Sequence, residues 1–171
     1  MSILDWTVDN FVLIAGLATT LKWVWEYSQS RKFEKNKFLL ERIEKFNSLP
    51  STQKMQKLLD WNAIKIELGG VSTKVDDVDL IEALKTHEQK MSFDSTEVLI
   101  REIFDDYLTG LTELIILSET GLVDQKNLKR FLKYWVSILN GTKQNKPKSL
   151  VETFQRFIDY YGYSEVSEFI K

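Results

Sequence analysis

The sequence predicts an all-α protein with an N-terminal membrane helix, a helical bundle and at most one small β-hairpin. An apolar run near the N-terminus carries aromatic residues on both sides. Apolar residues then recur at three- and four-residue spacing through most of the chain. Capping residues and glycines separate these periodic segments. We expect a membrane helix in residues 1–31 and a cytoplasmic helical domain in residues 32–171.

The composition excludes several classes of chemistry. The chain has 171 residues, of which 43% are hydrophobic and 28% are charged, which suits a packed core. Its net charge of −2 gives no overall basic field that would favour nucleic acid. Cysteine is absent, which excludes disulfides, thiolate catalysis and zinc–thiolate sites. One histidine excludes any mechanism that needs two from one chain.

The first predicted element is a membrane helix. Residues 11–21 carry no charge, but the run is shorter than the roughly 20 residues of a usual spanning helix. Trp6 precedes the run, and Trp23, Trp25 and Tyr27 follow it. Trp6 and Trp25 would lie about 28 Å apart in a helix, close to the roughly 30 Å of a bilayer core. Aromatic residues at both ends are typical of membrane interfaces.

Charge gives this helix an orientation. No Lys or Arg precedes Lys22, which disfavours a cleaved signal peptide. Basic residues follow at Arg31, Lys32, Lys35 and Lys37, so the positive-inside rule predicts a cytoplasmic C-terminal side. The alternative is that the segment forms a core helix of a soluble domain.

One face of the predicted helix is small and polar. At about 100° per residue, this face gathers Asp9, Val12, Gly16, Thr19, Thr20 and Trp23. Gly16 and Thr20 form the small-xxx-small spacing that lets helices approach closely. We predict that this face packs copies of the helix together or lines a pore. The alternative is a lone anchor whose threonine hydroxyls bond to their own helix.

Shorter elements follow. Periodicity predicts helices at 37–46, 52–61 and 77–87. Residues 64–75 alternate and contain Gly69-Gly70, which predicts either a hairpin or a loop.

The C-terminal half contains the longest predicted soluble helix, at 95–119. Asp94 or Ser95 caps it, and Gly121 follows its end. A helix opened by Asp124 stops at Gly141, and a basic polar linker follows at 142–148. Ser149 and Glu152 predict a capping box for a helix to about Tyr161, and Ser164 is predicted to cap a last turn or two.

No motif predicts catalysis. Glu102, Asp105 and Asp106 share a helix side, but no Glu-x-x-His motif supplies matching metal ligands, which favours a solvated acidic face. His87 has no partner that sequence can identify. We therefore predict no enzyme activity, no metal and no cofactor.

A basic cluster lies in the helix that Asp124 opens. Lys126 and Lys133 are one heptad apart, with Lys129 and Arg130 between them on the same side. The cluster is either a solvated face or a contact for an anion, a protein, RNA or lipid headgroups.

The order of several motifs resembles a group of uncharacterised small bacterial proteins. These motifs are LLDWN (58–62), ALKTHEQ (83–89), IREIFDDYLTGL (100–111), ETGLV (119–123), LKYWVSIL (132–139) and FIDYYGY (157–163). The resemblance implies one N-terminal inner-membrane helix with a helical cytoplasmic domain. It implies no activity, because the group has none established.

In size and helical character the chain is also similar to the accessory membrane protein of type VI-B CRISPR systems. That similarity implies an oligomeric pore with a HEPN-like helical domain, active in antiphage defence. The Arg-x(4–6)-His motif of HEPN ribonucleases is missing before His87. We therefore expect a non-enzymatic, self-associating membrane protein. The alternative is a tethered or soluble helical module that binds a protein or RNA partner.

Overall fold

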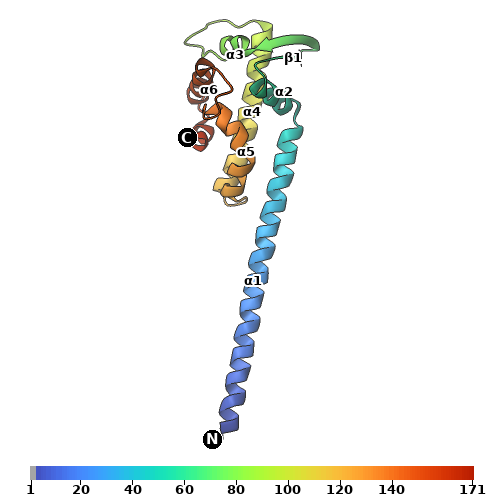
Figure 1. Cartoon of the computed structure of the whole chain (residues 1–171), viewed down its shortest axis with the longest axis vertical. Helices are drawn as coiled ribbons and strands as arrows, with labels where there is room; N and C mark the ends of the chain where they lie inside the picture. Colours follow the sequence, from blue (N-terminus) through green and yellow to red (C-terminus); the bar gives the residue numbers. More distant parts are fainter. Residues whose placement is uncertain (1–2) are drawn as a thin grey trace. The chain divides into compact units, whose positions relative to one another are not determined.

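The computed structural model describes the backbone of residues 3–171 and the side chains of residues 19–171. The described chain is mostly helical, with seven helices and one two-stranded hairpin (Figure 1). The predicted all-α class with a small hairpin is therefore confirmed. The chain divides into two compact units, Met1–Phe38 and Leu39–Lys171.

Helix α1 runs from Ile3 to Ser48 without interruption. The helix predicted at 37–46 is therefore the last part of a longer one. Every side chain from 19 to 37 is exposed, and burial begins with Leu39 and Phe46. The helix ends just before Leu49, because a residue that precedes a proline disfavours helical backbone.

Within the part of the chain that the structure describes, no helix combines the length and apolar character needed to cross a membrane. The predicted membrane helix takes most of its apolar residues from 11–18, whose side chains lie outside the described part.

The segment at 63–76 forms a hairpin, which decides between the two predicted alternatives. Strands β1 (Ala63–Leu68) and β2 (Val71–Asp76) pair antiparallel. Gly69 and Gly70 have φ angles of 55° and 83°, as a two-residue turn with positive φ at both positions requires. Ile66, Leu68 and Val75 are buried, so one face of the hairpin packs on the core.

Helices α2 (Pro50–Asp60), α3 (Asp77–Ala83) and α4 (Ser95–Glu119) build the centre of the second unit. Asp94 caps α4, and Glu97 completes the capping box, which selects Asp94 over Ser95. Gly121, with φ 72°, follows its end as predicted. Helix α4 supplies much of the core, including the fully buried Phe104, Tyr107 and Leu108.

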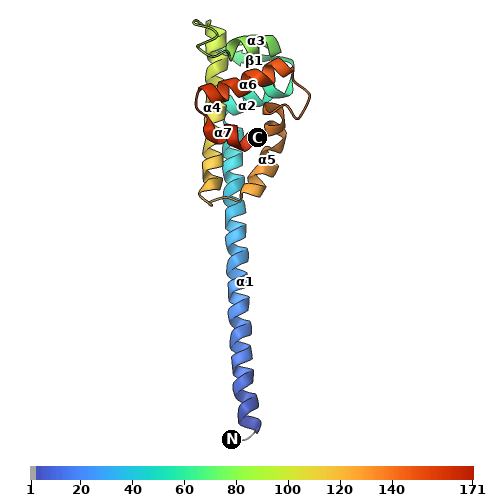
Figure 2. The same cartoon turned by 90° about the vertical axis from the view of Figure 1, so that its left-hand side faces the viewer.

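Helices α5 (Gln125–Leu139), α6 (Lys148–Tyr160) and α7 (Ser164–Ile170) complete this unit (Figure 2). Asp124 caps α5 as predicted, since its side chain accepts from the Asn127 amide at 2.8 Å.

Two predicted caps are wrong. Helix α6 begins two residues earlier than expected, with Pro147 at the cap position, so Ser149 lies inside the first turn. There its own carbonyl accepts from the Thr153 hydroxyl at 2.8 Å. Likewise Tyr163 precedes α7, and the Ser164 hydroxyl donates to Glu165 Oε2 instead of capping the helix.

The expected polar linker at 142–148 is also different from the prediction. The side chain of Lys146 is fully buried. Its Nζ donates to the Leu58 carbonyl at 2.9 Å, to the Trp61 carbonyl at 2.7 Å and to Asp77 Oδ1 at 2.7 Å. The segment is therefore tied into the unit, because this cation satisfies carbonyls at the end of α2.

Candidate functional site

Helix α1 presents large apolar side chains to the surroundings. Exposed fractions between 61% and 72% belong to Leu21, Trp23, Val24, Trp25 and Tyr27. At about 100° per residue these positions fall on several sides of the helix. A one-sided apolar stripe suits a single groove, whereas apolar side chains on several sides suit an apolar environment around the helix.

The predicted small, polar face is only partly described. Asp9, Val12 and Gly16 lie outside the described side chains, whereas Thr19, Thr20 and Trp23 are described and exposed.

Polar contacts lie within this apolar stretch and directly after it. Lys22 forms an exposed ion pair with Glu26 at 3.7 Å. Arg31 donates to the Tyr27 hydroxyl at 2.9 Å, and its guanidinium lies 5.3 Å from the Tyr27 ring. Charged side chains are thus mixed with the exposed apolar ones up to Tyr27, and from Arg31 to Lys37 they predominate.

The four predicted basic residues come together on α5. With Gln125, the side chains of Lys126, Lys129, Arg130 and Lys133 line an open groove of about 470 Å³, named here the basic groove. The helix forms this face because its apolar residues Leu128, Leu132 and Leu139 are buried on the other side.

The basic groove carries a concentrated charge. From Gln125 to Leu139, helix α5 contains no acidic residue. Within the described chain, none of its four cations takes part in an ion pair, and Lys129 Nζ lies 5.4 Å from the Phe169 ring. The four charges are therefore available to an anionic partner.

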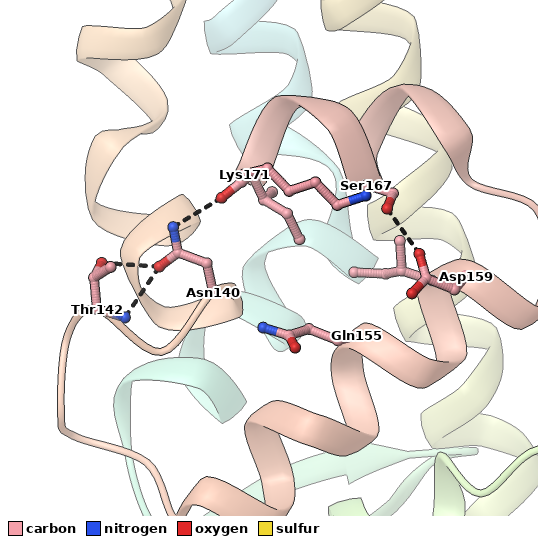
Figure 3. A pocket seen from close by; sticks show the side chains of 8 residues that line it. Asn140, Thr142, Gln155, Asp159, Ser167 and Lys171 are labelled. Carbon is pink, nitrogen blue, oxygen red and sulfur yellow. Dashed lines mark hydrogen bonds between the residues drawn. The ribbon is translucent and has the colours of Figure 1, made fainter.

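A polar pocket of about 340 Å³ lies where α5, α6 and α7 meet (Figure 3). Asn140 Nδ2 donates to the Ile170 carbonyl at 2.9 Å, and its Oδ1 accepts from the Thr142 hydroxyl at 2.8 Å. Ser167 Oγ donates to Asp159 Oδ1 at 2.7 Å. Sequence patterns did not predict this pocket, because its residues come from three separate segments. Its polar groups mostly bond to one another, so they join the ends of the helices.

A second polar cluster surrounds the buried Arg101. Its Nη1 donates to the carbonyls of Ala83 and Lys85, both at 2.7 Å, and its Nη2 donates to the Tyr161 hydroxyl at 2.5 Å. The guanidinium lies 4.1 Å from the Phe93 ring. Arg101 thus supplies hydrogen-bond donors at the C-terminal end of α3, where backbone carbonyls lack partners within the helix.

The candidate catalytic histidine borders this cluster, since the His87 ring also lies 6.1 Å from the Tyr161 ring. His87 is exposed, with its ring 5.5 Å from that of Phe93. Glu102 and Asp106 are exposed, whereas Asp105 is half-buried and accepts from the Tyr163 hydroxyl at 3.0 Å. Burial raises the pKa of Asp105, and the Tyr163 hydrogen bond partly opposes that shift. Among the described residues, no three acidic or histidine side chains form a group suited to a metal ion.

Comparison with protein-family models, curated proteins and solved structures found no match.

Proposed function

We propose that this protein is attached to a membrane through α1 and associates with copies of itself through that helix. The observation that carries the proposal is the set of exposed apolar side chains between Leu21 and Tyr27. Water is a costly environment for so many large apolar groups on one helix. A lipid bilayer around the helix removes that cost on every side at once.

The order of residues along α1 supports lipid as the environment. Residues 11–21 are uncharged, and tryptophan and tyrosine follow at Trp23, Trp25 and Tyr27, as at a bilayer interface. The exposed cations from Arg31 to Lys37 come next. Phosphate groups on the cytoplasmic side of a membrane attract such a run.

Self-association is supported by the small residues of the same helix. Gly16 and Thr20 are spaced by four, which allows close backbone approach between helices. Thr19 and Thr20 also add hydroxyls to that face. A ring of helices with this face inward would enclose a polar path. We therefore propose, more specifically, that the assembly is an oligomeric pore.

Fractionation tests the membrane attachment. The full chain is expected to stay with membranes after a carbonate wash, whereas a version starting at Lys32 is expected in the soluble fraction. Recovery of both versions as soluble protein would contradict the proposal.

A matched pair of variants tests whether membrane binding depends on the exposed apolar side chains of α1. Changing Leu21, Val24 and Trp25 to Gln keeps good helix formers but removes apolar surface, so carbonate-resistant membrane binding should fall severalfold. The control changes three exposed apolar residues of the second unit, Val71, Val78 and Met91, to Gln. Equal loss in the control would show that the α1 side chains have no special role.

Sizing in detergent tests the self-association. The wild-type chain is expected as one uniform assembly, and Gly16→Leu with Thr20→Leu is expected to shift it to smaller species. Leu17→Ile, on the same helix, is the control. For the pore, the assembly is placed in a planar bilayer, and Thr19→Val with Thr20→Val is expected to lower its conductance. A monomeric wild-type chain would overturn the oligomer, and a non-conducting assembly would overturn the pore.

A further inference from the structure

We infer that the basic groove of α5 docks on the phosphate groups of an anionic lipid bilayer. This inference rests on the proposed membrane attachment and names a second contact with the same membrane. It starts from four exposed cations on one helix face, at Lys126, Lys129, Arg130 and Lys133, with no acidic residue on that helix.

The shape of the groove suits a surface of many phosphates better than one small anion. Lys126 and Lys133 are separated by about 10 Å along the helix. The groove is open, and all of its lining side chains are exposed. A site for a single anion needs donors that converge on one point, usually with backbone amides. Exposed cations spread along a helix face instead match a surface that carries many separate phosphate groups.

The groove also favours lipid over RNA. Its lining of Gln125 and four cations contains no aromatic side chain on which an unpaired base could stack. The second unit follows the exposed apolar residues of α1 directly in the chain, since Leu39 comes twelve residues after Tyr27. A short tether keeps the local concentration of headgroups high, so even a weak electrostatic contact is populated.

The expected strength follows from the charges. Each cation close to an anionic membrane changes the ratio of docked to undocked protein by about fivefold. The effect should fall as salt rises, because the Debye length is about 10 Å at 0.1 M ionic strength. Four cations therefore give a contact that is strong at low salt and readily reversed at high salt.

The absence of cysteine makes the experiment direct. Gln125, which lines the groove, is changed to Cys in the full chain and labelled with a fluorophore. Exposed Gln155 on α6, outside the groove, receives the same label in a second protein. Both are placed in nanodiscs of phosphatidylcholine, or of phosphatidylcholine with phosphatidylglycerol, that contain a lipid with a quencher on its headgroup.

We expect phosphatidylglycerol to raise quenching at residue 125 severalfold, with a much smaller change at residue 155, and salt to reverse it. Changing Lys126, Lys129, Arg130 and Lys133 to Glu should abolish the increase. The charge-matched control changes four exposed cations elsewhere to Glu: Lys57, Lys65, Lys74 and Arg156. The control should keep the increase.

Three results would overturn the inference. The first is quenching at residue 125 that does not change when phosphatidylglycerol is added. The second is an equal loss of the quenching increase in both four-residue charge variants. The third is RNA binding that requires the four groove cations, together with lipid quenching that does not require them. Co-purification of the chain with nanodiscs of phosphatidylcholine alone measures the membrane attachment independently of the α5 contact. If the chain fails to enter them, the proposed membrane attachment fails; if it enters them without quenching at residue 125, only the α5 contact fails.

Discussion

Lys146 shows how a single side chain can hold several segments together. Replacing it by Met would leave the Asp77 carboxylate and the carbonyls of Leu58 and Trp61 without this donor in a buried place. We expect Lys146→Met to lower the free energy of unfolding by about 3 kcal/mol or more. Lys148→Met is the control, because the Lys148 side chain is 92% exposed and should contribute well under 1 kcal/mol. Denaturant unfolding followed by circular dichroism measures both, and equal effects would contradict the role given to Lys146.

Asp105 gives a pH-dependent prediction at the same scale. Burial raises its pKa in the folded protein above the ordinary 3.8. Below 3.8 the carboxyl is protonated in both states, and as pH rises toward the folded pKa the unfolded state loses its proton first. The free energy of unfolding therefore falls across that window.

Asp105→Asn removes this loss and keeps an acceptor for the Tyr163 hydroxyl. We expect the variant to be more stable than the wild type near neutral pH, with the gain disappearing below pH 3.8. Denaturant titrations at acidic and neutral pH measure it. Glu102→Gln changes an exposed carboxylate on the same helix and is the control, which should alter the free energy of unfolding by about 0.5 kcal/mol or less. A gain for Asp105→Asn that is equal at all pH values would refute the assigned cause.

At the scale of the elements, Gly110 fixes how α4 meets the last turns of α1. A Cβ at this position would lie 2.7 Å from the Phe46 ring. Gly→Ala inside a helix usually stabilises by about 1 kcal/mol, but overpacking should outweigh that gain and cost about 1–3 kcal/mol here. Phe46→Leu should restore part of the loss in a double-mutant cycle of thermal unfolding. Simple additivity of the two changes would argue against this contact.

Most helices could be predicted because their signals are local. Asp94, Asp124 and Gly121 act through backbone groups a few residues away, and sequence spacing contains that information. Ser149 and Ser164 are residue types that favour caps, but they lie inside the helices, because Pro147 and Tyr163 occupy the cap positions of α6 and α7.

The basic groove could be predicted for the same reason, since its residues belong to one helix. The roles of Lys146 and Asn140 could not be predicted. Lys146 bonds across more than eighty residues, and Asn140 bonds to a carbonyl of another helix. Such contacts depend on packing between segments, which periodicity does not encode.

At the scale of the whole molecule, the two units should respond differently to protease. Residues 19–37 form a helix whose side chains are all exposed, and trypsin can cut there after Arg31, Lys32, Lys35 and Lys37. Packed segments of the second unit must unfold locally before they can be cut. We expect brief trypsin treatment of the detergent-solubilised chain to give a resistant fragment that starts between residues 32 and 38. Mass spectrometry identifies it, and earlier cleavage at Lys57 or Lys65 would contradict the division into units.

The buried Lys146 also bears on the order of events during synthesis. Leu58 and Lys146 are 88 residues apart, so at about 5–20 residues per second the ribosome needs several seconds or more to pass from one to the other. Throughout that interval the end of α2 lacks its cation, while the apolar part of α1 has already been made. The second unit can therefore reach its final packing only late in translation. Chaperones or the insertion machinery would meet the apolar helix first, while the bundle that follows it is still incomplete.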